Sequence, residues 1–138
     1  TANVMLTHAS GASSVCLFSF DSGQRRAGVL EFQGVLGTIV APDPNRFDGT
    51  VRTHVGGEVR DEVELDDRGM GRGIGVVDMV RSLAEGATPR ANGELAYHVL
   101  EVMLAVGQSI ASGQPVELTS TAPVVEPLPA DWTPLAAR

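Results

Sequence analysis

The sequence predicts an α+β fold, an open, mostly antiparallel β-sheet with two helices packed on one face. Residues 1–70 contain short β-favouring runs separated by Gly and Pro, and residues 72–112 contain two stretches with apolar residues at helical spacing. Strands that precede helices, without alternation, favour a sheet with the helices on one side. At 138 residues, the chain has room for one domain and one core.

The first strands are expected at Asn3–His8 and Ser13–Phe20, separated by Gly11. In the second, Val15 and Leu17 fall on one face, and Cys16, Phe18 and Phe20 on the other. Both faces are apolar enough that neither is expected to be fully in water.

Two further strands follow a turn at Asp21–Gln24. Ala27–Gln33 is the third strand, and Gly34–Gly37 turns it into Thr38–Ala41. Pro42–Asn45 then stops the chain from continuing as a strand, because proline cannot donate to a ladder.

Thr50–Val55 and Glu58–Leu65 are predicted to form a hairpin about Gly56-Gly57. Charged and apolar residues alternate in the second of these strands until Asp61 breaks the pattern. An edge strand with one face in water is the expected result.

Asp66–Gly71 is a polar, glycine-rich loop, after which helical spacing begins near Gly73 and stops at Gly86. The buried stripe of this first helix is predicted to be Ile74, Val77, Met79, Val80, Leu83 and Ala84. Asn92 is the candidate N-cap of the second helix, which Gly113 ends. Its buried stripe is predicted to be Leu95, Val99, Val102, Met103, Val106 and Ile110.

The end of the chain is predicted to be a return strand and a proline-rich strap within 115–138. Val116–Thr119 is the return strand. Ala122–Arg138 holds four prolines and is expected to run extended over the surface, with Trp132 as an anchor. We therefore expect residues 1–138 to be a single domain, and a partner subunit to cover the other face of the sheet.

The charge balance argues against a nucleic-acid partner, and the apolar pattern argues against a membrane. A net charge of −7 argues against nucleic acid, which requires clustered positive charge, and the adjacent Arg25 and Arg26 are expected to be a solvated hairpin tip. No uninterrupted apolar run approaches the length needed to span a bilayer, and no signal-peptide pattern opens the chain. The single Cys16 is expected to be a buried thiol in a reducing compartment, so a cytoplasmic location is expected.

Every basic residue other than histidine is arginine, because the chain contains no lysine. No Schiff base, lysine general acid or P-loop lysine can come from it. A mechanism that requires lysine would have to use one from another segment. The first residue is Thr1, which we interpret as processing, an engineered boundary or a fragment.

Three segments in this order carry a family resemblance. They are Phe32–Asn45 (FQGVLGTIVAPDPN), Arg72–Asp78 (RGIGVVD) and Pro89–Met103 (PRANGELAYHVLEVM), the last followed by Gly113–Leu118. Together they resemble the C-terminal domain of the glucose–fructose oxidoreductase/inositol dehydrogenase (Gfo/Idh/MocA) family, across most of residues 13–120.

The resemblance implies a Rossmann domain that binds NAD or NADP and is missing from this chain, and a sheet that lines the substrate site and joins subunits. It implies an oxidoreductase, a dehydrogenase acting on a sugar, polyol or related carbonyl compound, assembled as a homodimer or homotetramer through the sheet face. The family's dinucleotide fingerprint, its lysine motif and its acidic-and-histidine helix motif are absent from the sequence. Catalytic and cofactor-binding residues are therefore predicted to be none, and the chain alone is predicted to be non-catalytic, with no cofactor of its own.

Four residues are the candidates to face a substrate: His8, Asp67, Arg68 and Arg72. His8 ends the first strand, and the other three lie in the loop before the first helix, where Asp and Arg could bond the hydroxyls of a polyol. The competing interpretation is a solvated turn. His54 and His98 are expected to be an exposed strand position and a packing residue, and the histidines and cysteine lack zinc-ligand spacing, so no metal is predicted.

Three hypotheses of function remain. The first is the substrate-binding and oligomerisation domain of an NAD(P)-dependent oxidoreductase. The second is a stand-alone homo-oligomeric binding or assembly module with the same fold and no redox activity. The third is a small-molecule-binding domain with no redox partner, which fits the composition but is supported by no motif. The sequence leaves open the substrate, the choice between NAD and NADP, the direction of reaction and the number of subunits.

Overall fold

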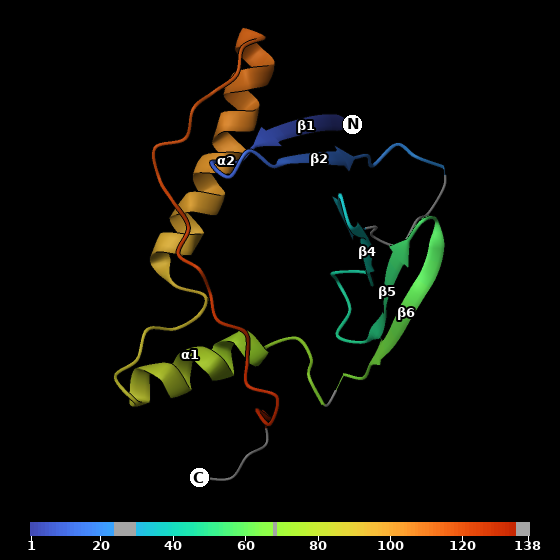
Figure 1. Ribbon diagram of the computed structural model, residues 1–138. Helices are drawn as coiled ribbons and strands as arrows, with labels where there is room; N and C mark the ends of the chain where they lie inside the picture. Colours follow the sequence, from blue (N-terminus) through green and yellow to red (C-terminus); the bar gives the residue numbers. More distant parts are fainter. Residues whose placement is uncertain (24–29, 68, 135–138) are drawn as a thin grey trace. The chain divides into compact units, whose positions relative to one another are not determined.

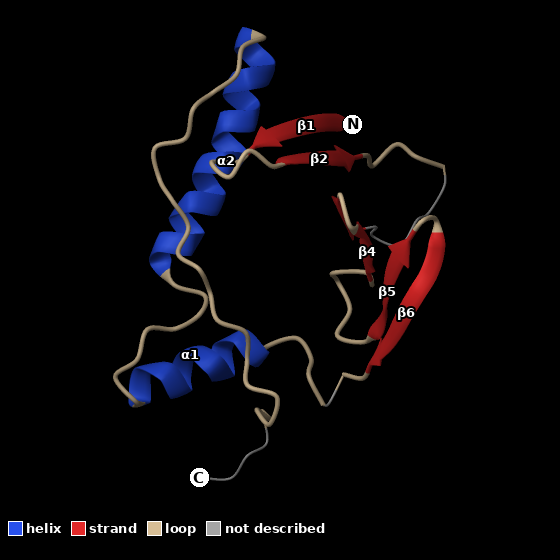
Figure 2. Cartoon of the chain, viewed as in Figure 1, coloured by secondary structure: helices blue, strands red, loops and turns tan. Residues whose placement is uncertain are grey.

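The computed structural model describes residues 1–23, 30–67 and 69–134. The fold is α+β, as predicted, with two antiparallel sheets and two helices (Figures 1 and 2). The chain divides into two compact units. Unit 1 combines Thr1–Arg25 with Gly93–Pro123, and unit 2 combines Arg26–Asn92 with Val124–Arg138.

Unit 1 contains a two-stranded antiparallel sheet, β1 (Ala2–Thr7) paired with β2 (Ser13–Phe18). The pairs Val4–Cys16 and Met5–Val15 place these side chains alternately on two faces, as the sequence predicted. Cys16 is a free thiol that is half-buried, so the expectation of a fully buried thiol is wrong. The predicted turn at Asp21–Gln24 and the Arg25-Arg26 pair lie partly or wholly outside the described residues.

Unit 2 contains a four-stranded sheet in the order β3-β4-β5-β6. Its strands are β3 (Leu30–Gly34), β4 (Gly37–Ala41), β5 (Gly49–Val55) and β6 (Glu58–Leu65). The predicted single sheet is thus divided between the units. Gly56 (φ 64°) and Gly57 (φ 89°) form the β5–β6 hairpin, because a two-residue type I′ turn requires positive φ at both positions.

An irregularity in β6 lies directly beside Asp61, the residue that breaks its charge pattern. The ladder pairs Thr53 with Asp61 but His54 with Val59, so Arg60 is the extra residue of a β-bulge. The added residue reverses the alternation before it, so Val59 lies on the face of Glu62 and Glu58 on the face of Asp61 and Val63. β6 also lies at an edge of the sheet with every residue exposed, which confirms the edge-strand prediction.

The four-stranded sheet has one polar and one apolar face. Cross-strand partners share a face, so Phe32, Ile39 and Val63 lie on one side, and Gln33, Thr38 and Glu62 on the other. Arg52 pairs with Glu62 at 2.6 Å, and Thr50 donates to Glu64 at 2.6 Å on the polar face. Alternating polar residues occupy this side on all four strands, so the two faces of the four-stranded sheet differ in polarity.

Helix α1 (Ile74–Ala84) begins after Gly73 and ends in a Schellman motif. The amide of Ala87 donates to the Ser82 carbonyl, at 2.8 Å, and that of Gly86 (φ 71°) to Leu83, at 3.2 Å. Gly86 is therefore the C-terminal stop that the sequence predicted.

Helix α2 (Gly93–Ser112) begins directly after Asn92, the predicted N-cap, and Gly113 (φ 67°) follows its last residue. Among the described residues it is the one helix long and apolar enough to cross a membrane, with 20 residues and a mean hydropathy of 1.2. The sequence showed no uninterrupted run of this length because Glu94 and Glu101 interrupt it. A core helix of a water-soluble protein meets the same criterion.

The predicted apolar stripes of the two helices are confirmed in part. On α1 the buried residues are Asp78 and Ser82, and Ile74 and Val77 are half-buried, whereas Met79, Val80, Leu83 and Ala84 are exposed. On α2 Leu95, Val102 and Val106 are half-buried, whereas Val99, Met103 and Ile110 are exposed. Extended segments that form hydrogen bonds with the helices, and not a sheet, lie against them. Side chains that can donate or accept hydrogen bonds therefore occupy the covered sides.

Two further expectations are corrected. Val116–Thr119 forms no strand, because Glu101 takes up the amide of Thr119 where a ladder partner would be. Among the described residues no apolar side chain is buried, so the predicted single core is not formed within either unit. The apolar sides of the sheets and helices are left open.

Candidate functional site

The predicted substrate-facing residues form ordinary surface contacts. His8 Nε2 lies 2.7 Å from Ser14 Oγ in unit 1. Asp67, in unit 2, accepts the amide of Gly69 at 2.9 Å through Oδ1, the geometry of an Asx turn. Its behaviour matches the solvated-turn interpretation. Arg68 lies outside the described residues.

Arg72 brings together two of the segments that carry the family resemblance. Its guanidinium donates to Asn45 Oδ1 at 2.8 Å, which joins the loop before α1 to the Pro42–Asn45 loop after β4. In that loop Asp43 accepts the amide of Asn45 at 2.9 Å. Asp67 and Arg72 thus share a loop region of unit 2, whereas His8 belongs to unit 1.

The neighbouring pair Arg46–Asp48 is a surface ion pair. The Arg46 guanidinium donates to both carboxylate oxygens of Asp48, at 2.7 and 2.9 Å. The hydrogen bond with Arg46 lowers the pKa of Asp48 below its usual range, and the same bond raises the pKa of Arg46. Both groups are in water, so the pair organises the loop surface without the desolvation that a catalytic acid requires.

A more highly connected cluster lies in unit 1, where Glu101 of α2 meets Thr119 and Ser120. Glu101 Oε1 accepts the amide of Thr119 at 3.0 Å and its hydroxyl at 2.7 Å. Oε2 accepts the amide of Ser120 at 2.9 Å and also its hydroxyl. Hydrogen bonds from the Ser120 hydroxyl and then from Thr119 lower the pKa of Glu101 to about 2.

His98 extends this cluster without making it a nucleophilic site. Its Nδ1 lies 2.8 Å from Ser120 Oγ. Ser120 gives its only hydroxyl proton to Glu101, so the imidazole Nδ1–H must donate to Ser120. A serine nucleophile requires the reverse order, with histidine between the acid and the serine and accepting the serine proton. The arrangement fixes the Thr119–Ser120 segment against α2, which agrees with the packing role predicted for His98.

The surface beside this cluster is shallowly hollowed. A depression of about 430 Å³ is lined by Gly93, Glu94, Tyr97, Ser120 and Thr121. Its carboxylate, phenol and hydroxyl groups are hydrogen-bonding groups of the type that bind hydroxylated molecules. No group of three or more potential metal ligands occurs among the described residues.

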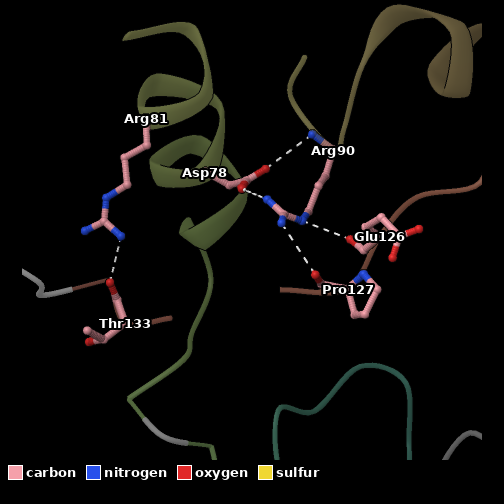
Figure 3. Close-up of polar contacts among 6 residues, drawn as sticks. All are labelled: Asp78, Arg81, Arg90, Glu126, Pro127 and Thr133. Carbon is pink, nitrogen blue, oxygen red and sulfur yellow. Dashed lines mark hydrogen bonds and ion pairs between the residues drawn. The ribbon is translucent and has the colours of Figure 1, made fainter. Parts of the chain in front are cut away.

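The second connected cluster ties α1 to the strap, which we define as Val124–Pro134 (Figure 3). Asp78 is 6% exposed, and its Oδ1 lies 2.5 Å from Arg90 NH1. Its Oδ2 also accepts the Arg90 amide, at 3.3 Å. The carboxylate therefore holds both the backbone and the guanidinium of Arg90.

The guanidinium of Arg90, held by Asp78, donates hydrogen bonds to main-chain carbonyl oxygens of the strap. Arg90 Nε lies 2.9 Å from the Glu126 carbonyl, and NH2 lies 3.4 Å from that of Pro127. One helical turn beyond Asp78, Arg81 donates to the carbonyls of Thr133 at 2.7 Å and Pro134 at 2.9 Å.

Trp132 completes this contact. The Arg81 guanidinium carbon lies 5.0 Å from the centre of its ring, within the range of a cation–π interaction. The prediction that Trp132 anchors the strap is confirmed. Apolar spacing did not identify Asp78, Arg81 and Arg90 as a cluster, although an acidic and a basic residue three positions apart inside an apolar helical stripe indicated it.

Comparison with known proteins gives no relative. No protein-family model, curated protein or solved structure matches this chain.

Proposed function

We propose that this chain is the substrate-side and oligomerisation domain of a cytoplasmic NAD(P)-dependent oxidoreductase that acts on a sugar, polyol or related carbonyl compound. A Rossmann domain outside this chain would bind NAD or NADP and supply the lysine that this sequence lacks. The resemblance of Phe32–Asn45, Arg72–Asp78 and Pro89–Met103 to the Gfo/Idh/MocA family supports the redox part of the proposal. The exposed apolar face of the four-stranded sheet supports association through the sheet.

The observation that carries the proposal is the open apolar face of the four-stranded sheet. Its large members are 39–57% exposed: Leu30, Phe32, Ile39, Val63 and Leu65. They come from β3, β4 and β6, and Val51 of β5 pairs with Val63 on the same face, which also carries Thr53 and Asp61. An exposed group of apolar side chains of this kind is typical of a contact with another macromolecule.

A second copy of the chain fits this face. Strands about 4.8 Å apart, each with five or more residues about 3.3 Å apart, span a face of roughly 20 by 20 Å. Side-chain relief raises its accessible area above the flat footprint of about 400 Å², toward the roughly 600–1,000 Å² per partner of standard interfaces. The opposite face carries the Arg52–Glu62 and Thr50–Glu64 pairs and is satisfied in water.

The same face gives the second candidate its support. A stand-alone homo-oligomeric module would bury it in the same way and would require no cofactor domain. The two candidates differ in redox chemistry, since only the first expects activity once a Rossmann domain is present. Both expect this chain alone to neither bind NADH nor oxidise polyols.

Neighbouring residues of β3 provide a matched test of association. Phe32→Glu places a charge on the apolar face, whereas Gln33→Glu places the same charge on the polar face. We expect sedimentation velocity to show weaker self-association for the Phe32 variant and wild-type association for the Gln33 variant. Equal behaviour of the two variants would remove the sheet face from the proposal. Saturable quenching of NADH fluorescence by the chain alone would contradict the assignment of the cofactor to another domain.

A further inference from the structure

The strap is held mainly through its main chain. Four of its carbonyl oxygens, those of Glu126, Pro127, Thr133 and Pro134, accept hydrogen bonds from Arg90 and Arg81. Contacts of this kind do not depend on the side chains that the strap carries. They depend on an extended backbone whose carbonyl oxygens can accept hydrogen bonds from another element. Polyproline-type segments have such a backbone.

The strap sequence provides such a backbone. Pro127, Pro129 and Pro134 restrict φ and remove amide donors. One local turn, in which the Trp132 amide donates to the Pro129 carbonyl at 3.0 Å, positions the indole for its contact with Arg81. The recognised element is thus an extended proline segment followed by an aromatic turn.

Charge adds selectivity. The strap carries Glu126 and Asp131 and no basic residue, whereas the surface it contacts presents Arg81 and Arg90. Asp78 neutralises part of this positive charge and holds the Arg90 guanidinium by a hydrogen bond. An oriented arginine loses less conformational entropy on binding than a free one.

We propose that the surface formed by Asp78, Arg81 and Arg90 is a recognition site for acidic, proline-rich segments, and that its partner in trans is the strap of a second copy of this chain. The chain leaves unit 2 at Asn92 and re-enters it at Val124, so the whole of Gly93–Pro123 separates the strap from its surface. A long connection lowers the effective concentration of the strap in cis. Exchange between copies preserves every contact, which makes it a low-cost route to a dimer.

This site is independent of the apolar sheet face, and the test separates them. In a Phe32→Glu background, which blocks association through the sheet, native mass spectrometry would follow dimer formation as concentration rises. One variant, Arg81→Gln/Arg90→Gln, disables the surface, and another, Trp132→Ala, removes the aromatic anchor of the strap. We expect each to raise the dissociation constant of the dimer by about tenfold or more, because the first loses charge-assisted hydrogen bonds and the second loses the cation–π contact. An equimolar mixture should form a heterodimer, since one intact surface meets one intact strap.

A peptide experiment keeps the proposal testable if a variant fails to fold. The chain contains one tryptophan, so Trp132→Phe gives a receptor without tryptophan fluorescence. A synthetic peptide of residues 123–134 then carries the only indole. We expect saturable fluorescence anisotropy with this receptor, and no saturation with a peptide in which Pro127 and Pro129 are replaced by glycine. Absence of peptide binding, or peptide binding without a dimer in the Phe32→Glu background, would overturn the proposal.

Discussion

Replacing Arg90 by methionine tests the Asp78–Arg90 pair most sharply, because methionine retains much of the aliphatic stem and removes the guanidinium. Asp78 is 6% exposed in the native chain, and in the variant it would keep the hydrogen bond from the backbone amide of residue 90. Removing one member of a fully buried ion pair costs roughly 3–5 kcal/mol. The Arg90 side chain is 32% exposed, so water screens part of this cost and leaves about 2 kcal/mol.

The lost strap contacts add to this value. The bonds from Arg90 to the Glu126 and Pro127 carbonyls are exposed, and together they contribute about 1 kcal/mol. We therefore expect Arg90→Met to lower the free energy of unfolding by about 3 kcal/mol. Asp78→Asn retains an acceptor oxygen but removes the charge, and should cost about 2 kcal/mol.

The double variant decides whether the two residues act as a pair. With asparagine at position 78, the loss of Arg90 leaves no buried charge, so the double variant should cost about 3 kcal/mol and not the sum of the single variants. The resulting coupling energy is about 2 kcal/mol. Urea unfolding at fixed protein concentration, followed by both Trp132 fluorescence and far-UV circular dichroism, gives each value. The exposed pair Arg46–Asp48 is the control and should show little coupling. Additive costs at Asp78 and Arg90 would refute the reasoning.

The remaining predictions concern three other places in the chain. Glu101 has a folded-state pKa of about 2, against an ordinary value of 4.5, so its stabilising contribution should be complete above pH 4.5 and be lost as the pH falls toward 2. Amide hydrogen exchange at Thr119 and Ser120 measures this loss, and Glu101→Gln should make exchange there insensitive to acid once intrinsic exchange is corrected. Gly37→Ala should destabilise the β4–β5 pairing by about 3 kcal/mol, because its Cβ would meet the His54 carbonyl oxygen at a strained φ of 153°. Gly107→Ala, on α2 with no atom within 4 Å of the added Cβ, should instead stabilise the chain by about 0.5–1 kcal/mol in urea unfolding. Ile39→Glu should weaken association more than Thr38→Glu, because the two adjacent side chains lie on opposite faces of β4.

The parts of the fold that the sequence predicts well are those governed by local chemistry. Positive φ at Gly56, Gly57 and Gly86 places the hairpin and the end of α1, because glycine adopts this conformation at least cost. The alternating charges of β6 predict its position at an edge of the sheet. These signals need no knowledge of distant residues.

The covered side of α1 could not be predicted from apolar spacing. The rule assumes that a helix buries its apolar stripe, but α1 is covered by a strap whose carbonyls require donors, so Asp78 and Arg81 face it. The same reason explains Val116–Thr119: a short apolar run resembles a strand until Glu101 takes the amide of Thr119. Of the candidate site residues, Asp67 and Arg72 carry local turn and loop contacts, and sequence alone could not distinguish these from substrate contacts.

Sedimentation equilibrium of the Arg81→Gln/Arg90→Gln chain tests the central claim most directly, because this background removes the arginines that hold the strap and leaves the sheet face as the route to association. The account predicts reversible self-association that Thr38→Glu leaves unchanged and that Ile39→Glu weakens by at least about tenfold, as expected for a charge placed in an apolar interface. A chain that remains monomeric at every concentration, or that associates equally with either substitution, would contradict the claim that the apolar face of the four-stranded sheet joins two copies.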